Sequence, residues 1–344
     1  MEIRRVQFTG GSSYVLTLPK EWIDAQKIRK NDPLGIEIQP DGTLIVTKTI
    51  EHEPLQRKLE FPVDGITEPA YLFRLLIGAY ISGITTIVIT SKERLPPFVR
   101  VVVRDFTQMT IGQEAIEEDD SAITLKDLLN PSEMPFANTI KRMFVIVKAM
   151  HEDAITAIRT GNQTLAADVT ARDNDVDRLH WLIARQTHMI LSNTALSKKM
   201  NISPRMAVHY YIISRIIERI GDHVERIAQN AGAIRKKKID SAILTKILKA
   251  SELSVGIFDR SIVSFFNNDL KKSDKNIESV KVLEALCGEI NNLVIQQETS
   301  DAIVLGYITE SVRRAGEYAA DISENVINYL VGDELTMSGK PERK

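Results

Sequence analysis

Two pairs of carboxylates, each pair spaced four residues apart, are the side chains in this sequence best suited to chemistry. Asp173 and Asp177 lie in the stretch RDNDVDRLHWL, and Glu218 and Asp222 lie in IIERIGDHVERIAQN. Residues at positions i and i+4 of a helix share one face, and like charges at this spacing cost a helix about 0.2–0.5 kcal/mol. The pattern therefore predicts a positively charged partner that offsets the repulsion.

Gly221 interrupts the second of these stretches at a mid-helix position. A glycine in a helix interior costs about 1 kcal/mol relative to alanine, which indicates the close approach of a neighbouring backbone. If the two helices pack side by side, the four carboxylates converge, and they cannot all stay ionised without a counter-charge. Oxygen-rich ligand sets suit iron, manganese, magnesium or zinc, so the four residues are a candidate metal site.

A second interpretation of the same residues is an ordinary solvated helix face. Arginines that could form common ion pairs lie close by in the sequence, namely Arg172, Arg178, Arg219 and Arg226. Four histidines also lie nearby, and we expect them at the surface or at the edge of the core rather than as ligands: His180, His188, His209 and His223. The pattern alone leaves both interpretations open.

Long amphipathic helices must position these residues. From residue 131 onward, apolar residues recur with the helical period, and short breaks separate about six predicted helices. The stretch 311–325, SVRRAGEYAADISEN, aligns with the second acidic stretch and places Gly316 on Gly221 and Glu317 on Asp222. This repeat predicts two three-helix bundles joined by the basic linker 235–238.

The sequence before these helices predicts two smaller parts. Residues 1–49 hold two short strands around a Gly-Gly-Ser-Ser turn, a short helix and a hairpin that turns at Asp41-Gly42. Residues 50–130 read as a linker and a small α/β unit with a helix over 68–82 and a hairpin at 118–120. Within that unit, LPPFVRVVVRDF fits either a helix or a strand. The fold class is therefore multidomain: a small β-rich domain, a small α/β unit and an all-α double bundle.

Composition limits the classes of function. The chain is 43% hydrophobic and 26% charged with a net charge of −2, so any nucleic-acid surface must be local. The single Cys287 excludes an internal disulfide and a cysteine-based zinc site. The apolar segment 71–90 contains Arg74 and is broken by Ser82-Gly83, which favours a buried helix followed by a strand over a membrane span. We expect a cytoplasmic protein that is not an enzyme, since no nucleophile-base arrangement and no phosphate-binding glycine loop occur.

The helical residues resemble a known family. ERIGDHVERIAQN resembles the Glu-Arg-Ile-Gly-Asp signature of PhoU, the phosphate uptake regulator family, and DNDVD resembles its paired-acid motif. The resemblance implies two tandem three-helix bundles, which we place at 131–235 and 236–332. We expect residues 333–344 to form a disordered tail. It also implies a multinuclear iron or zinc cluster, carried over here to Asp173, Asp177, Glu218 and Asp222.

The second repeat departs from the family pattern. Arg313 replaces the expected glutamate, and Val280 replaces the first acid of the preceding helix, although Glu284 and Glu317 keep the other two positions. In the first repeat, Arg226 stands where the family usually has asparagine. Arginine and valine do not ligate metals, so we expect at most one cluster per chain, in the first bundle.

The N-terminal stretch SSYVLTLPKEWIDAQKIRKNDPLGIEIQPDGTLIVTK is similar to the AbrB/MazE-type swapped-hairpin domain, with Asn31-Asp32 in place of its Gly-Asp. That resemblance implies an obligate dimer that binds DNA through basic residues. The matching positions are Arg4, Arg5, Lys20, Arg29 and Lys30. Residues 1–49 hold seven basic and six acidic residues, so a dimerisation module without DNA affinity stays open.

Taken together, the two resemblances predict a PhoU-like regulator of phosphate uptake and phosphate signalling. In this hypothesis a DNA-binding homodimer carries a metal-binding helical bundle. One alternative is an adaptor that docks a phosphate transporter or a sensor kinase without touching DNA. A more distant alternative is a phosphohydrolase that uses two metal ions.

Overall fold

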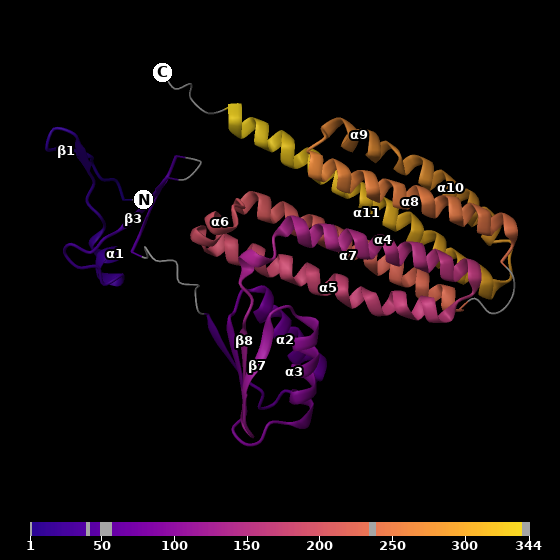
Figure 1. Ribbon diagram of the computed structural model, residues 1–344, viewed down its shortest axis with the longest axis horizontal. Coiled ribbons are helices and arrows are strands. Elements are labelled where there is room, and N and C mark those ends of the chain that lie inside the picture. Colours follow the sequence, from indigo (N-terminus) through magenta and orange to yellow (C-terminus); the bar gives the residue numbers. More distant parts are fainter. Residues whose placement is uncertain (1, 39–41, 49–56, 234–238, 339–344) are drawn as a thin grey trace. The chain divides into compact units, whose positions relative to one another are not determined.

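The computed structural model describes residues 2–38, 42–48, 57–233 and 239–338 (Figure 1). The chain divides into two compact units, Met1–Leu55 and Gln56–Lys344. The basic linker 235–238 predicted between the bundles lies outside the described residues.

The N-terminal unit consists of two small antiparallel hairpins and one short helix. Strands β1 (Gln7–Thr9) and β2 (Ser13–Val15) pair with each other, and so do β3 (Gly35–Ile38) and β4 (Leu44–Thr47), with helix α1 (Lys20–Ala25) between the two pairs. Asn31 has a φ of 72°, the left-handed conformation that asparagine tolerates in a turn. These elements confirm the order predicted for this part of the chain.

The α/β unit opens the second unit. Its elements are β5 (Lys58–Pro62), α2 (Pro69–Ile81), β6 (Thr86–Thr90), α3 (Pro97–Met109), β7 (Gln113–Glu118) and β8 (Ala122–Asp127). The sheet has the order β5-β6-β8-β7, in which β5 and β6 are parallel and the other pairs are antiparallel. Helices α2 and α3 bury one side of the sheet, against Ile87 and Leu125.

The segment that fitted either a helix or a strand is the helix α3. Its buried side chains face the sheet and recur with the helical period of 3.6 residues rather than the strand period of two: Val99, Val102, Val103 and Phe106. Among the described residues, no helix is both long enough and apolar enough to cross a membrane. This agrees with the interpretation of 71–90 as the helix α2 followed by the strand β6.

A short 3₁₀ turn (Pro131–Glu133) leads into the first bundle, which contains α4 (Phe136–Thr160), α5 (Gln163–Ser192) and α7 (Pro204–Ala233). Local signals set the helix ends. Gly161 ends α4 with a φ of 69°, and the Asn162 side chain accepts a hydrogen bond from the Leu165 amide at the start of α5. Ser203 accepts a hydrogen bond from the Met206 amide and so caps the start of α7, where Pro204 is the first helical residue.

The second bundle contains α8 (Ser241–Asn267), α9 (Leu270–Glu278), α10 (Val280–Val294) and α11 (Thr299–Ser338). The two bundles lie side by side along their length (Figure 1), and their buried apolar side chains form one continuous core. The predicted fold class, with a double helical bundle after two small strand-containing parts, is confirmed.

The prediction of about six helices was wrong in detail. Asn193 caps a short extra helix, α6 (Thr194–Met200), by accepting bonds from the Ala195 and Leu196 amides. The second helix of the second bundle is divided at Ser279 into α9 and α10, and the Asp269 side chain caps the start of α9 by accepting a bond from the Lys272 amide. The predicted tail was also placed too early, since α11 continues through Ser338; residues 339–344 lie outside the described part of the chain.

Candidate functional site

The two carboxylate pairs meet where α5 packs against α7. An apolar stripe of α7, spaced with the helical period, is buried in full and faces the bundle core: Ile213, Ile217, Ile220, Val224, Ile227 and Ala231. Gly221 lies next to this stripe. A Cβ atom added there would lie 3.3 Å from Asp173 Oδ1 and 3.6 Å from Val176 Cγ1. Because Gly221 has no side chain, α5 and the Asp173 carboxylate can pack closely against α7 at this position.

Burial and mutual repulsion perturb the acidic side chains at this contact. Loss of solvent raises the pKa of Asp173 to about 7, and the charges of Asp177, Glu225, Asp222 and Glu218 contribute to that rise. Loss of solvent and then the Asp222 charge raise the pKa of Glu218 to about 7. The pKa of Asp177 rises to about 6 for the same two reasons. The structure thus brings all four predicted residues into one electrostatic cluster.

A fifth carboxylate belongs to this cluster. Burial raises the pKa of Glu225, and the Asp222 charge adds to that effect. Burial likewise raises the pKa of Asp222, against the opposing charges of Arg226, Arg215 and Arg219. Glu225 follows Asp222 by three residues and Glu218 by seven, so its helical spacing was visible in the sequence, but the predicted site omitted it.

The cluster has less positive charge than its acids require. Arg215 donates to Glu218 Oε1 at 2.8 Å and is the cation that forms an ion pair with the cluster within the described residues. Asp173 Oδ1 and Glu218 Oε2 are buried atoms that accept no hydrogen bond from the part of the chain that the structure describes. A buried oxygen atom without a partner is costly, so these two atoms fit the ligand positions of a bound cation.

Of the four arginines of the solvated-face interpretation, Arg172 and Arg178 pair with other acids, whereas Arg219 and Arg226, in the described part of the chain, act on the cluster through their charge alone. Arg172 lies 3.0 Å from Asp168, and Arg178 lies 3.7 Å from Asp175. The Arg219 guanidinium lies 5.6 Å from the ring centre of Tyr318. Within the described residues, none of these three nor Arg226 forms an ion pair with the four predicted ligands, although Arg226 lowers the pKa of Asp222 through its charge.

The expectation that the histidines lie at the surface or at the edge of the core was wrong for His180, which is buried at 4% exposure. Its Nδ1 atom lies 3.0 Å from Ser214 Oγ between α5 and α7, and burial lowers its pKa to about 4. The same cause lowers the pKa of the half-buried His223 to about 4. His188 is exposed, as expected, and His209 Nδ1 lies 2.7 Å from Asn325 Oδ1.

The equivalent place in the second bundle contains its own cation. Arg313 forms ion pairs with both Glu310 and Glu317. A Cβ atom added at Gly316 would meet Leu283 of α10 and Ser254 of α8, in the same way that Gly221 meets Val176 and Val147. This correspondence supports the alignment of the two repeats. A guanidinium thus occupies the second bundle where the first has unpartnered carboxylate oxygens.

The ligand set of the first bundle is not preassembled. Within the described residues, no group of three or more His, Cys, Asp or Glu side chains is already arranged to hold a metal ion. Binding a cation would therefore require rotation of the carboxylates toward a common point.

The basic residues predicted to bind DNA fall into two groups. Arg4 donates to Thr17 Oγ1 at 3.0 Å and to the Leu18 carbonyl at 3.1 Å, so its guanidinium is occupied within the N-terminal unit. The other four are exposed, and their side chains have no hydrogen-bond or ion-pair partner among the described residues: Arg5, Lys20, Arg29 and Lys30.

Comparison with known proteins matches both parts of the chain. The PhoU domain family matches residues 140–231, and the family of the antidote-toxin recognition protein MazE, a bacterial antitoxin, matches residues 7–53. A phosphate-specific transport system accessory protein PhoU homolog from Caulobacter vibrioides is 26% identical over 203 residues, which are 57% of this chain and 87% of the relative. PhoU homolog 1 from Thermotoga maritima is 22% identical over the same length, 86% of its own.

Solved structures agree on the fold of the helical region. The phosphate transport system regulatory protein PhoU from Streptococcus pneumoniae superposes with a TM-score of 0.51 at 14% identity, covering 57% of this chain and 94% of that one. PhoU from Pseudomonas aeruginosa superposes with a TM-score of 0.52 at 17% identity, covering 57% and 96%. The helical region therefore has a PhoU-type fold and matches the PhoU domain family over residues 140–231, and the N-terminal residues 7–53 match the MazE family.

Proposed function

We propose that this protein regulates phosphate uptake and phosphate signalling from the cytoplasm, without catalysing a reaction. The proposal rests on the match of the helical region to nearly the whole length of relatives named as accessory proteins of a phosphate-specific transport system. The α5–α7 cluster supports a sensing role in particular, because burial raises the pKa values of its acids and two of its oxygen atoms have no hydrogen-bond partner among the described residues.

The second part of the proposal is a metal ion at the α5–α7 cluster. Asp173, Asp177, Glu218 and Asp222 would hold it, with Glu225 at the edge, and oxygen ligands of this kind suit iron or zinc and, as alternatives, manganese or magnesium. A bound cation would neutralise the carboxylates whose pKa values burial has raised. The role of the cation would be electrostatic: by neutralising these carboxylates it would favour one packing of α5 against α7.

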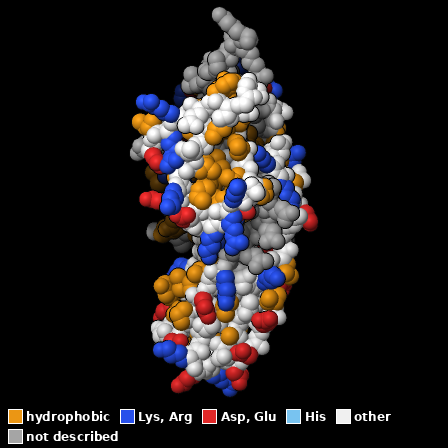
Figure 2. All heavy atoms as spheres, turned by 90° about the vertical axis from the view of Figure 1, so that its left-hand side faces the viewer, with side chains coloured by type: hydrophobic (Ala, Val, Ile, Leu, Met, Phe, Trp, Pro, Cys, Tyr) orange, Lys and Arg blue, Asp and Glu red, His pale blue; other side chains and the backbone are white. Residues whose placement is uncertain are grey.

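The third part is a dimer formed through the N-terminal unit. No side chain described in residues 2–48 is buried, and large apolar side chains are open to solvent, including Phe8 at 60%, Tyr14 at 77% and Ile38 at 76%. Figure 2 shows hydrophobic side chains lying open on the surface among Lys and Arg side chains. A small unit without a core of its own is stabilised by covering such surface, and a second copy would do so.

Deleting the gene should make phosphate uptake insensitive to the phosphate concentration of the medium. Complementation with the wild type should restore the response, whereas the pair Asp173→Asn and Glu218→Gln should not, because it removes the charges that would hold the cation. Labelled-phosphate uptake in phosphate-poor and phosphate-rich medium measures this. Glu284→Gln, an exposed acid on α10, is the matched control. A deletion strain that still represses uptake normally would refute the regulatory proposal.

We also propose that the dimer binds DNA, and that exposed cations of the N-terminal unit contact phosphates. The pair Arg5→Glu and Lys20→Glu should weaken binding to upstream DNA at least tenfold at low salt. It should also flatten the dependence of log K on log salt by roughly 0.9 for each phosphate that the variant no longer neutralises. Fluorescence anisotropy between about 50 and 200 mM salt, the range over which such interactions are most visible, gives both quantities.

Arg142→Glu on α4 is the control for charge reversal outside the N-terminal unit, since Arg142 is exposed but belongs to the helical region. Light scattering on the same samples should give about twice the chain mass of 38.7 kDa for both variants and for the wild type. A dimeric wild type that binds DNA no better than the double variant would instead favour the adaptor that docks a phosphate transporter or a sensor kinase.

A further inference from the structure

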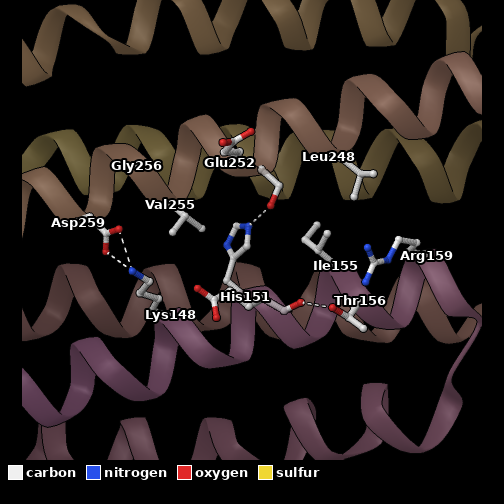
Figure 3. Close-up of a pocket in the computed structure, with 12 residues that line it drawn as sticks. Lys148, His151, Ile155, Thr156, Arg159, Leu248, Glu252, Val255, Gly256 and Asp259 are labelled. Atoms are coloured by element: carbon white, nitrogen blue, oxygen red, sulfur yellow. Dashed lines mark hydrogen bonds and ion pairs between the residues drawn. The ribbon is translucent and has the colours of Figure 1, made fainter.

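A groove between α4 and α8 lies away from the α5–α7 cluster, where the first helices of the two bundles meet (Figure 3). The two helices run antiparallel there, because Lys148 pairs with Asp259 while the later His151 pairs with the earlier Ser251. The cavity has a volume of about 510 Å³. Pockets for small molecules commonly enclose about 300–1,000 Å³, so the groove has the size of a ligand site.

The floor of the groove is apolar and kept open by a glycine. Ile155 of α4 and Val255 of α8 line it and are half-buried. Gly256 lies in the middle of α8, where a Cβ atom would meet only the far end of the Arg260 side chain, at 3.2 Å. A mid-helix glycine costs about 1 kcal/mol, and no neighbouring helix requires this one, in contrast to Gly221 and Gly316. Its effect is to preserve the hollow.

His151 supplies a buried polar group at this place. The side chain is 3% exposed and reaches across the groove from α4 to α8, where its Nε2 atom lies 2.8 Å from Ser251 Oγ (Figure 3). Burial lowers its pKa to about 4, so the ring is neutral at pH 7. Its Nδ1 atom has no hydrogen bond within the described residues. In the tautomer that donates Nε2–H to the serine, Nδ1 offers a lone pair.

The charged residues of the lining leave the centre of the groove acidic. Lys148 is neutralised by Asp259, whose two carboxylate oxygens lie 2.9 and 2.8 Å from its Nζ atom. Glu152 on α4 and Glu252 on α8 are exposed on the two walls, and neither side chain has a partner among the described residues. Arg159, in the last turn of α4, is the remaining charge and lies toward one end (Figure 3).

We propose that the α4–α8 groove binds a small aliphatic diamine or polyamine. A primary ammonium group has three N–H donors and no acceptor, which suits a lining of two unpaired carboxylates and an imidazole lone pair. The methylene chain of such a ligand would cover Ile155 and Val255, which removes apolar area from water at about 25 cal/mol per Å². Because the groove is formed by one helix from each bundle, an occupied site would tie the two bundles together.

Isothermal titration calorimetry of the full-length protein with spermidine, at constant ionic strength, tests this proposal. We expect saturable binding at one site per chain. The pair Glu152→Gln and Glu252→Gln should weaken it at least tenfold, and Gly256→Leu should block it by filling the floor. Both glutamates are exposed, so the pair should unfold at the same temperature as the wild type.

Two controls separate specific binding from attraction between charges. Glu284→Gln removes an exposed acid outside the groove and Asp173→Asn removes one from the α5–α7 cluster, so both should bind spermidine like the wild type. Tetraethylammonium carries charge without N–H donors and should not bind at the groove. Equal binding by the wild type and the glutamate pair, loss of binding in Asp173→Asn, or equal binding of tetraethylammonium would each overturn the proposal.

Discussion

Replacing Arg185 with leucine should lower the free energy of unfolding by about 3–5 kcal/mol, the cost typical of breaking a buried ion pair from one side. The Arg185 side chain is 2% exposed and forms an ion pair with Asp127, whose side chain is 5% exposed. It also donates to the Tyr80 carbonyl, and its guanidinium lies 4.8 Å from the centre of the Tyr80 ring. The leucine variant would leave the Asp127 carboxylate buried without a cation, with the Leu129 amide still donating to its Oδ1 atom.

Urea denaturation at pH 7 measures this effect. The double variant Arg185→Leu with Asp127→Leu should recover most of the stability, because apolar residues often replace a buried pair at little cost. Arg100→Leu is the matched control. Its ion pair with Glu118 joins side chains that are 32% and 48% exposed, and losing it should cost less than about 1 kcal/mol. An Arg185→Leu protein within about 1 kcal/mol of the wild type would contradict the expectation.

The Arg185 contact also matters for the proposed sensor. The same helix, α5, carries Asp173 and Asp177 near its middle and Arg185 about two turns later. Gln186 continues the contact by donating to the carbonyls of Pro131 and Met134 at 2.9 and 2.8 Å. Because Arg185 of α5 binds Asp127 and Tyr80 of the α/β unit, a shift of α5 at the carboxylate cluster would also move its contacts with that unit.

Asp173→Asn should stabilise the metal-free protein at pH 8 and weaken metal binding at the same time. The pKa of Asp173 in the folded protein is about 7, above the unfolded value of 3.8. The folded state therefore holds this proton more tightly, and its contribution to stability is present below about pH 4 and is lost as the pH rises through 7. Asparagine cannot ionise and avoids this loss.

The size of that gain follows from the same quantities. Each pH unit between the two pKa values is worth about 1.4 kcal/mol, and because the side chain is half-buried, solvent screening reduces the total to about 1–2 kcal/mol at pH 8. Unfolding in chelator at several pH values between about 4 and 8 measures it. Asp175→Asn, on the same helix and beside Arg178, is the control and should not gain stability as the pH rises.

Metal should reverse the order of stability. With iron or zinc present, the wild type should be stabilised and the Asp173→Asn protein should not, and the affinity of the variant should be at least tenfold lower. Metal binding should also weaken as the pH falls through about 7, since the ligands must be deprotonated. Elemental analysis and titration with iron, zinc, manganese and magnesium distinguish the ions. If the variant binds each ion as tightly as the wild type, the carboxylates are not the ligands.

The comparison of the two bundles explains why one site is expected rather than two. Arg313 and Arg314 together neutralise Glu310 and Glu317 from within the second bundle, so those acids have no need of an external cation. In the first bundle, Arg215 forms an ion pair with Glu218 alone among the described residues. Asp173 Oδ1 has no hydrogen-bond partner there. The substitution of one acid by arginine was visible in the sequence, but its ion pairs are a finding of the structure.

The sequence by itself determined the local features of this protein. Helices α4, α5 and α7, the buried stripe of α7 and the shared face of Glu218 and Asp222 follow from the 3.6-residue period, which acts between near neighbours. The hairpins β3-β4 and β7-β8 follow from alternation and turn residues in the same way. The short helices α6 and α9 were not predicted. Each begins where a side chain caps a few backbone amides, and such a cap is a weaker sequence signal than periodicity.

The tertiary structure alone decided which distant residues meet. The Arg185–Asp127 pair joins residues 58 positions apart, and His151 and Ser251 are 100 positions apart. No local period encodes such contacts, because they depend on how whole helices pack. Tertiary packing also decided that Asp173 is buried and that Arg172 pairs with Asp168 instead. Desolvation and ion pairing act through space rather than along the chain.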